Sequence, residues 1–150
     1  MATPNPTAET TLQIKRTFAA PREKVFGAWT QPEALKKWCA PSEEFSVPDA
    51  KVDLRVGGKY RIAMKAPDGN LHVAIGTYRE ILSPRKLVFT WTWEGSGMPE
   101  TLVTLEFHDH GASTELVLTH ELFPNVEQRD KHAQGWVGCL NGLEKMLDRN

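Results

Sequence analysis

AWTQPEALKKWCAP, the stretch at residues 28–41, carries two tryptophans nine positions apart with a proline between them. Proline fits the first position of a helix, because its missing N–H would have no partner there and its φ is already helical. The stretch therefore predicts two short helices, the second beginning at Pro32. Residues at helical spacing form one buried stripe on each helix. These stripes are Val25, Ala28 and Trp29 in the first helix and Leu35 and Trp38 in the second.

Runs on both sides of this stretch alternate between apolar and polar residues, which is the period of a half-buried β-strand. PDGN at 67–70 is typical of a hairpin turn, because proline presets φ and glycine supplies the positive φ that closes the turn. Apolar residues occupy both faces of the run at 71–82, so its inner face is not assigned. The predicted strands are 11–18, 59–64, 71–82, 87–93, 101–107 and 113–120.

A long helix is predicted near the end of the sequence. Asn125 suits the N-cap, Gln128 stands at capping-box spacing, and Pro124 blocks extension backwards. The apolar residues of the helix fall in one narrow stripe, which consists of Ala133, Trp136, Leu140, Leu143 and Leu147. A strand, two short helices, a run of antiparallel strands and a long helix predict an α+β fold in which a curved sheet grips that helix.

The composition is that of one globular domain. Of the 150 residues, 40% are hydrophobic and 25% are charged, which predicts a single domain at 11–150. The start, MATPNPTAETT, has neither an apolar core nor a positive cluster, so residues 1–10 are interpreted as a disordered tail. The formal net charge of −1 disfavours nucleic acid and membrane partners, because no excess of basic residues is present to meet phosphates or anionic lipid. Neither a signal-peptide pattern nor a bilayer-spanning apolar run occurs, which predicts a cytoplasmic protein.

Cys39 and Cys139 lack C-x-x-C spacing, so we expect free thiols in a reducing compartment. We expect Cys39 beside the short helices and Cys139 on the flank of the long helix. A disulfide needs Cα atoms within about 7 Å. The two cysteines are therefore predicted to lie too far apart to form one.

No metal or cofactor is predicted. His108-Asp109-His110 has the residue types of a metal site, but Gly111 follows at once, so a solvated turn is the favoured interpretation. No G-x-S-x-G, P-loop or G-x-G-x-x-G motif occurs. The sequence therefore offers no signature of a known catalytic or nucleotide site.

Three glycines, Gly135, Gly138 and Gly142, fall on the flank of the long helix nearly opposite its apolar stripe. Each costs up to about 1 kcal/mol relative to alanine inside a helix. Either another segment approaches this flank closely, such as the second subunit of a homodimer, or the helix is locally weak. The sequence does not choose between these explanations.

The sequence resembles the activator of heat-shock-protein-90 ATPase homologue-like family. The segments that carry the resemblance are VFGAWTQPEALKKW, the GG before a strand, GTYREILSPRKLVFTW, LTHE at 118–121 and HAQGW in the last helix. They extend the resemblance from about Thr11 to Leu147. The family belongs to the helix-grip superfamily, alongside START lipid-transfer domains, birch-pollen allergens and polyketide cyclases.

This resemblance implies a cavity between the sheet and the long helix, roofed by the short helices and often holding an apolar small molecule, with a possible link to stress responses. Cys39 stands where the family often carries a second bulky aromatic after the tryptophan, which implies a wider mouth or altered packing. Eukaryotic co-chaperones of the family carry a further N-terminal domain that contacts the chaperone, and these 150 residues leave no room for it. A chaperone-interacting module therefore remains only an alternative.

The expected function is non-enzymatic binding of a hydrophobic small molecule, apolar, aromatic or lipid-like. Aromatic rings supply apolar walls for such a ligand, although they could equally fill the core. The main alternative is a cyclase- or hydratase-type enzyme in which His120 and a carboxylate such as Glu80 move protons inside the cavity. The predicted ligand-binding residues are Trp29, Trp38, Tyr60, Met64, Tyr78, Phe89, Trp91, Trp93, His120, Trp136 and Leu140.

Overall fold

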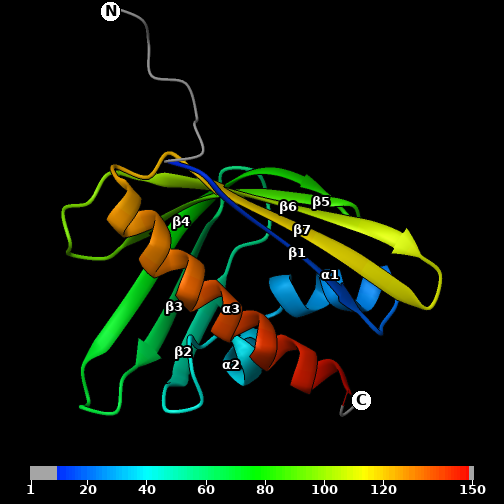
Figure 1. Cartoon of the computed structure of the whole chain (residues 1–150), viewed down its shortest axis with the longest axis horizontal. Coiled ribbons are helices and arrows are strands. Elements are labelled where there is room, and N and C mark those ends of the chain that lie inside the picture. The colour runs from blue at the N-terminus through cyan, green and yellow to red at the C-terminus, as the bar shows by residue number, and fades with distance from the viewer. Residues whose placement is uncertain (1–9, 149–150) are drawn as a thin grey trace, which may run out of the picture.

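A computed structural model describes residues 10–148, which form one antiparallel sheet with three helices on its concave side (Figure 1). The strands are β1 (Leu12–Phe18), β2 (Ser46–Val52), β3 (Lys59–Lys65), β4 (Leu71–Leu82), β5 (Lys86–Trp93), β6 (Thr101–His110) and β7 (Ser113–Glu121). The helices are α1 (Arg22–Thr30), α2 (Pro32–Trp38) and α3 (Val126–Asp148). The predicted α+β helix-grip fold is confirmed. Except for residue 10, the predicted tail lies outside the described residues.

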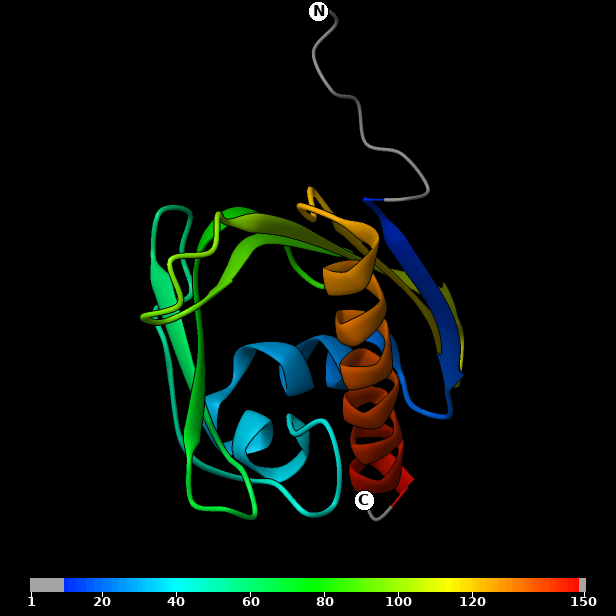
Figure 2. The same cartoon turned by 60° about the vertical axis from the view of Figure 1, so that its left-hand side comes forward.

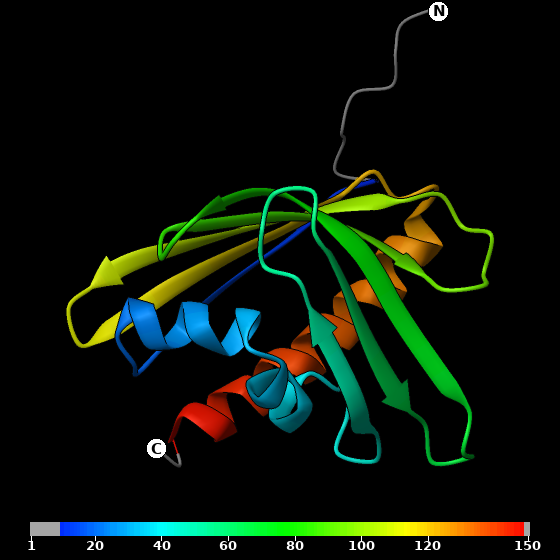
Figure 3. The same ribbon diagram turned by 180° about the vertical axis from the view of Figure 1, so that it is seen from behind.

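The sheet is a meander whose two edges are joined by the short helices. Its strand order is β1-β7-β6-β5-β4-β3-β2, and every neighbouring pair is antiparallel. Because β1 and β2 occupy opposite edges, α1 and α2 carry the chain across the concave side. Figure 2 shows the sheet arching over all three helices, and Figure 3 shows α2 lying between β2 and α3.

The second strand, β2, is the one that sequence alternation does not assign. It is an edge strand, and its register against β3 shifts between Ser46 and Asp49. Pro48 lies inside this irregular part, where its missing N–H is tolerated because the ladder is already interrupted. The strand is therefore held by its position beside β3 and α2.

The inner face of β4 could not be assigned because the strand does not keep one phase. Its register against β5 shifts between Tyr78 and Glu80. Just before this shift, the Thr77 amide donates to the Thr90 hydroxyl at 2.8 Å. A Cβ added to Gly76 would collide with the Thr90 carbonyl oxygen, so only glycine allows the two strands to approach this closely. The sheet bends here.

The two tryptophans of the opening stretch fix the corner between α1 and α2. The Trp38 indole N–H donates to the Ala28 carbonyl oxygen at 2.8 Å. The Trp29 and Trp38 rings meet edge to face, with centroids 4.6 Å apart. Both side chains are buried, and α2 begins at Pro32 as predicted. A buried hydrogen bond and a ring contact therefore hold the angle between the helices.

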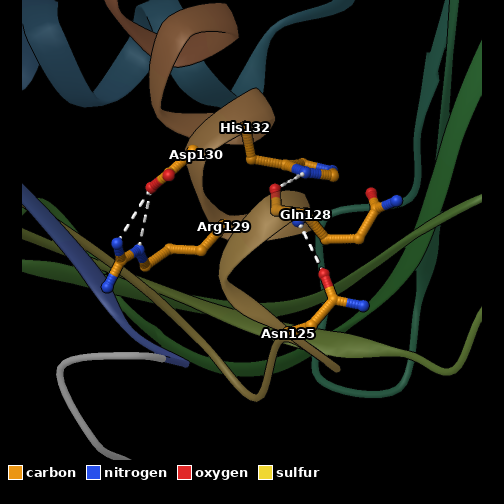
Figure 4. Close-up of polar contacts among 5 residues, drawn as sticks. All are labelled: Asn125, Gln128, Arg129, Asp130 and His132. Carbon is orange, nitrogen blue, oxygen red and sulfur yellow. Dashed lines mark hydrogen bonds and ion pairs between the residues drawn. The ribbon is translucent and has the colours of Figure 1, made fainter.

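The long helix α3 has the predicted cap and buried stripe. The Asn125 side-chain oxygen accepts a hydrogen bond from the Gln128 amide at 2.9 Å, as Figure 4 shows. The stripe residues Trp136, Leu140, Leu143 and Leu147 are buried, and Ala133 is half-buried. Within residues 10–148, no helix is long and apolar enough to cross a membrane.

The glycine flank of α3 is covered by the end of α2 and the residues after it. A Cβ on Gly138 would collide with the Pro41 carbonyl oxygen, and one on Gly142 would lie 2.8 Å from the Trp38 carbonyl oxygen. A Cβ on Gly135 would meet only Pro41, at 4.0 Å. The close approach that the glycines indicate thus comes from within the chain, and a second subunit is not needed to explain them.

This contact predicts opposite effects for two alanine substitutions on one helix. Gly138→Ala should lower the free energy of unfolding by about 1–3 kcal/mol, because the added methyl forces the Pro41 backbone away. Gly135→Ala is the matched control and should raise it by up to about 1 kcal/mol, through helix propensity alone. Urea unfolding of both variants measures this difference. Equal effects would mean that α3 and residues 38–41 do not touch.

Candidate functional site

A cavity of about 490 Å³ opens between the N-terminal half of α3, the inner face of β3 to β5, and the loop after α2. Most of its wall is apolar or aromatic, with a few polar side chains contributed by the first turns of α3. Its lining residues are Pro41, Phe45, Met64, His72, Trp91, Trp93, Gln128, Lys131, His132, Gly135, Trp136 and Cys139. A concave apolar wall with few polar groups is the usual form of a small-molecule site.

Four of the eleven predicted ligand-binding residues border this cavity, and these are Met64, Trp91, Trp93 and Trp136. The other seven lie in the packed interior: Trp29, Trp38, Tyr60, Tyr78, Phe89, His120 and Leu140. Their contact with a ligand stays a prediction. Four of them, Trp29, Tyr60, Tyr78 and Phe89, border a space of only about 20 Å³ among the aromatic rings.

His120 is fully buried behind Trp136 in a hydrogen-bonded chain. The Trp136 indole N–H donates to His120 Nδ1 at 2.9 Å, and His120 Nε2 lies 2.6 Å from the Thr101 hydroxyl oxygen. The single hydroxyl proton of Thr101 goes to the Trp91 carbonyl oxygen at 2.8 Å. His120 must therefore carry its proton on Nε2 and donate it to Thr101, with Nδ1 as the acceptor.

This network requires a neutral imidazole. Burial lowers the pKa of His120 well below its ordinary value, and neighbouring His132 lowers it further. A proton added to Nδ1 would face the indole N–H of Trp136 with no acceptor between them. Both ring nitrogens are occupied, so His120 orients Trp136 in the cavity wall and has no free nitrogen to offer a ligand.

His132 holds a second tryptophan in the same way, on the cavity side of α3. Its Nδ1 donates to the Gln128 carbonyl oxygen at 2.8 Å (Figure 4), and its Nε2 accepts from the Trp93 indole N–H at 3.0 Å. Burial lowers the pKa of His132, and the bond to the Gln128 carbonyl partly offsets this. A neutral His132 thus accepts a hydrogen bond from Trp93.

The two histidines make the aromatic wall a fixed surface. The Trp91 ring contacts Trp93 on one side and Trp136 on the other, with centroids 5.5 and 5.0 Å apart. The outer two rings are each anchored by one histidine, and the His120 and His132 rings are themselves 5.4 Å apart. Such interlocked side chains lose little further freedom when a ligand binds.

The cysteines correct a prediction. Cys39 follows α2 as expected. The expected separation from Cys139 is wrong, because both side chains are buried and their thiols are close enough to hydrogen bond. That contact, together with burial, raises the pKa of Cys139 well above its ordinary value. Cys139 borders the cavity, whereas Cys39 faces the aromatic interior.

The segment His108-Asp109-His110 was predicted to be a turn. It is instead the exposed end of β6, and the turn lies at Gly111 and Ala112. Asp109 accepts a hydrogen bond from the Gly111 amide at 2.9 Å, which stabilises that turn. Within the described part of the chain, no group of three or more histidine, cysteine or acidic residues converges on a metal position.

Comparison with known proteins identifies the family of this chain. A sequence model of the family described as activator of Hsp90 ATPase homolog 1-like protein matches residues 19–148. The chain belongs to this family. No protein of curated function matches it.

Solved structures resemble this chain over nearly its whole length. A Chromobacterium violaceum protein is 27% identical, with a TM-score of 0.83 over 92% of this chain and 96% of that one. A Nitrosomonas europaea protein is 28% identical, with a TM-score of 0.81 over 95% and 97%. The AHSA1 protein of Silicibacter pomeroyi, at 24% identity and a TM-score of 0.82 over 92% and 97%, shares the fold.

Sequence reasoning missed several wall residues of this family member. His132 stands four positions before Trp136, a spacing that puts both on one helix face and could have paired them. Phe45 comes from a loop and His72 from β4, whose inner face the sequence did not assign, and the centroids of their rings lie 6.1 Å apart. Neither carries a local sequence signal, because only the fold brings them together.

The buried histidines predict a loss of stability in mild acid. Their native pKa values are lowered, so the native state stays neutral while the unfolded chain, with a histidine pKa of about 6.5, takes up protons. The free energy of unfolding should fall as pH drops below about 6.5, by up to about 1.4 kcal/mol per pH unit for each histidine that stays neutral.

Urea unfolding between about pH 7.5 and 5.5, together with imidazole NMR, measures this effect. The expected spectrum shows His120 as the neutral Nε2–H tautomer throughout this range. A flat stability profile, or a His120 that titrates at the ordinary histidine pKa, would contradict the hydrogen-bonded chain derived above.

Proposed function

We propose that this family member is a non-enzymatic binding protein for a hydrophobic small molecule, apolar, aromatic or lipid-like, held in the cavity beside α3. The observation that carries the proposal is the aromatic wall of Trp91, Trp93 and Trp136 around about 490 Å³ of empty space. Sites for small molecules commonly occupy about 300–1,000 Å³. A filled core would leave no such space behind three large rings.

The polar groups of the wall support recognition by shape more than by charge. His132 and the indole N–H groups of Trp93 and Trp136 are already hydrogen-bonded within the protein. The Trp91 indole N–H is buried and has no hydrogen-bond partner among the described residues. A ligand oxygen that reached it would satisfy this donor, which otherwise costs about 1–3 kcal/mol.

Proton-transfer catalysis by His120 and Glu80 has less support. Both His120 nitrogens are engaged, and burial keeps its pKa well below neutrality. Glu80 pairs with Lys86 at 3.4 Å, and both side chains are partly exposed. A general acid or base must reach the proton that it transfers, and neither group lines the cavity.

Two further parts of the proposal concern context. We place the protein in the cytoplasm, because two free cysteines suit a reducing compartment. A stress-related role and contact with a chaperone are supported by the family name alone. No geometric feature of the described residues favours either one over ligand binding.

Filling the cavity from its helical wall tests the proposal. Gly135 borders the cavity, and a Cβ there has open space apart from Pro41 at 4.0 Å, so Gly135→Leu should occupy the site without disturbing the core. We expect 1-anilinonaphthalene-8-sulfonate and fatty-acid probes to bind the native protein at about one per chain. The variant should bind them at least about tenfold more weakly, a loss of about 1.4 kcal/mol.

Gln134→Leu is the matched control, because Gln134 is the exposed neighbour of Gly135 and does not border the cavity. It should leave affinity within about twofold, which is under 0.5 kcal/mol. Probe fluorescence and tryptophan emission report binding, and urea unfolding checks that both variants fold. Equal affinity of the two variants, or no saturable binding to the native protein by a broad set of probes, would refute the proposal.

A further inference from the structure

Cys39 and Cys139 meet where α2 ends against α3. Cys39 is the C-cap of α2, and Cys139 lies one residue after Gly138, whose bare backbone touches Pro41. The absence of side chains at Gly138 and Gly142 lets the two backbones approach closely. Their approach brings the thiols within hydrogen-bonding reach, and both cysteines are free.

The two thiols face different spaces. Cys139 borders the cavity and is 5% exposed, whereas Cys39 is 1% exposed and faces the closed aromatic interior beside Trp29 and Trp136. A reagent that enters the cavity therefore reaches Cys139 before Cys39. This arrangement resembles a pair in which one thiol reacts first and its neighbour resolves the product.

We propose that Cys39 and Cys139 form a redox-active dithiol, which low-molecular-weight disulfides entering through the cavity convert to an intrachain disulfide. The Cys139 thiolate attacks the disulfide R–S–S–R, forming a Cys139–S–S–R bond and releasing RSH. The Cys39 thiolate then attacks the Cys139 sulfur, forming the Cys39–Cys139 bond and releasing a second RSH. The protein loses two electrons and two protons, and the small disulfide gains them.

The new bond changes the wall of the cavity as well as the redox state. Pro41 and Phe45 line the cavity and lie on the segment that begins at Cys39. A disulfide would tie the start of this segment to α3 by a covalent bond in place of a backbone contact. Disulfides that form in reducing compartments are usually transient, and they serve catalysis or redox sensing.

The test uses the full chain and 2-hydroxyethyl disulfide at about pH 9.5, because the raised pKa of Cys139 leaves little of the attacking thiolate at lower pH. We expect the native protein to lose about 2 Da and both free thiols, with a cross-linked peptide that contains Cys39 and Cys139. Cys39→Ala should instead accumulate a mixed disulfide on Cys139. Cys139→Ala should leave Cys39 unmodified while the native protein reacts fully.

Three measurements keep the result decisive. In urea both thiols should react, which shows that the reagent is competent. Gly135→Leu, which fills the cavity one helical turn before Cys139, should slow the reaction at least about tenfold if the cavity is the route, whereas the exposed Gln134→Leu should not. Early peptide maps of the native protein should show Cys139 modified first, and they replace the alanine variants should one fail to fold.

Several outcomes would overturn the inference. These are a native protein that stays reduced, disulfide-linked dimers in place of the intrachain bond, Cys39 modified first, and a Gly135→Leu variant that reacts as fast as the native chain. None of these measurements requires a bound ligand. Failure of ligand binding in the Gly135→Leu experiment is therefore distinguishable from failure of the dithiol chemistry.

Discussion

The rest of the structure depends on a backbone contact between α3 and the residues that follow α2. At Gly138 and Gly142 no side chain separates the helix from the carbonyl groups of Pro41 and Trp38. This contact seats α2 on the long helix, and α2 in turn packs on β2 at the sheet edge. A helix that carried ordinary side chains here would push α2 outward and open the concave side of the sheet.

The cavity begins where this contact ends. One turn before Gly138, the same flank of α3 reaches Gly135, which borders the open space and has no close neighbour except Pro41. The glycine flank therefore has two consequences along its length. Backbone meets backbone at Gly138, whereas Gly135 borders open space, and Pro41 and Phe45 line the cavity on the side of the loop after α2.

The sequence predicted most of the fold because its strongest patterns are local. Helical spacing placed Trp38 and Trp136 on buried stripes, and alternation predicted the strand at 87–93 that carries Trp91. Local patterns failed where long-range geometry decides the outcome. The bend at Gly76 gives β4 two phases, and β2 exists because β3 and α2 offer it an edge. The contact of Cys39 with Cys139 likewise joins residues far apart in the chain.

The candidate site was harder to predict, because aromatic residues that fill a core and those that border a cavity have the same sequence pattern. Trp91 and Phe89 alternate on one strand face, yet the first reaches the cavity and the second is enclosed with Tyr60 at a centroid distance of 5.4 Å. The position of each side chain relative to the cavity makes the difference, and no local sequence pattern encodes that position. His120 shows the same limit, since the strand that ends at His120 was predicted but its hydrogen bonds to Trp136 and Thr101 required the fold.

The two buried histidines explain how a mostly apolar wall can bury polar indole groups and keep its rings in fixed positions. Each imidazole satisfies an indole N–H that would otherwise be buried without a partner, and its second nitrogen donates to an oxygen. Each imidazole stays neutral because burial disfavours its charged form and because the nitrogen that accepts from the indole must carry no proton. The cost of burying these polar atoms is offset by hydrogen bonds inside the protein. Trp93 and Trp136 can then present their rings to the cavity in fixed positions. The indole N–H groups of Trp93 and Trp136 and both imidazoles are thus committed to holding the rings in place.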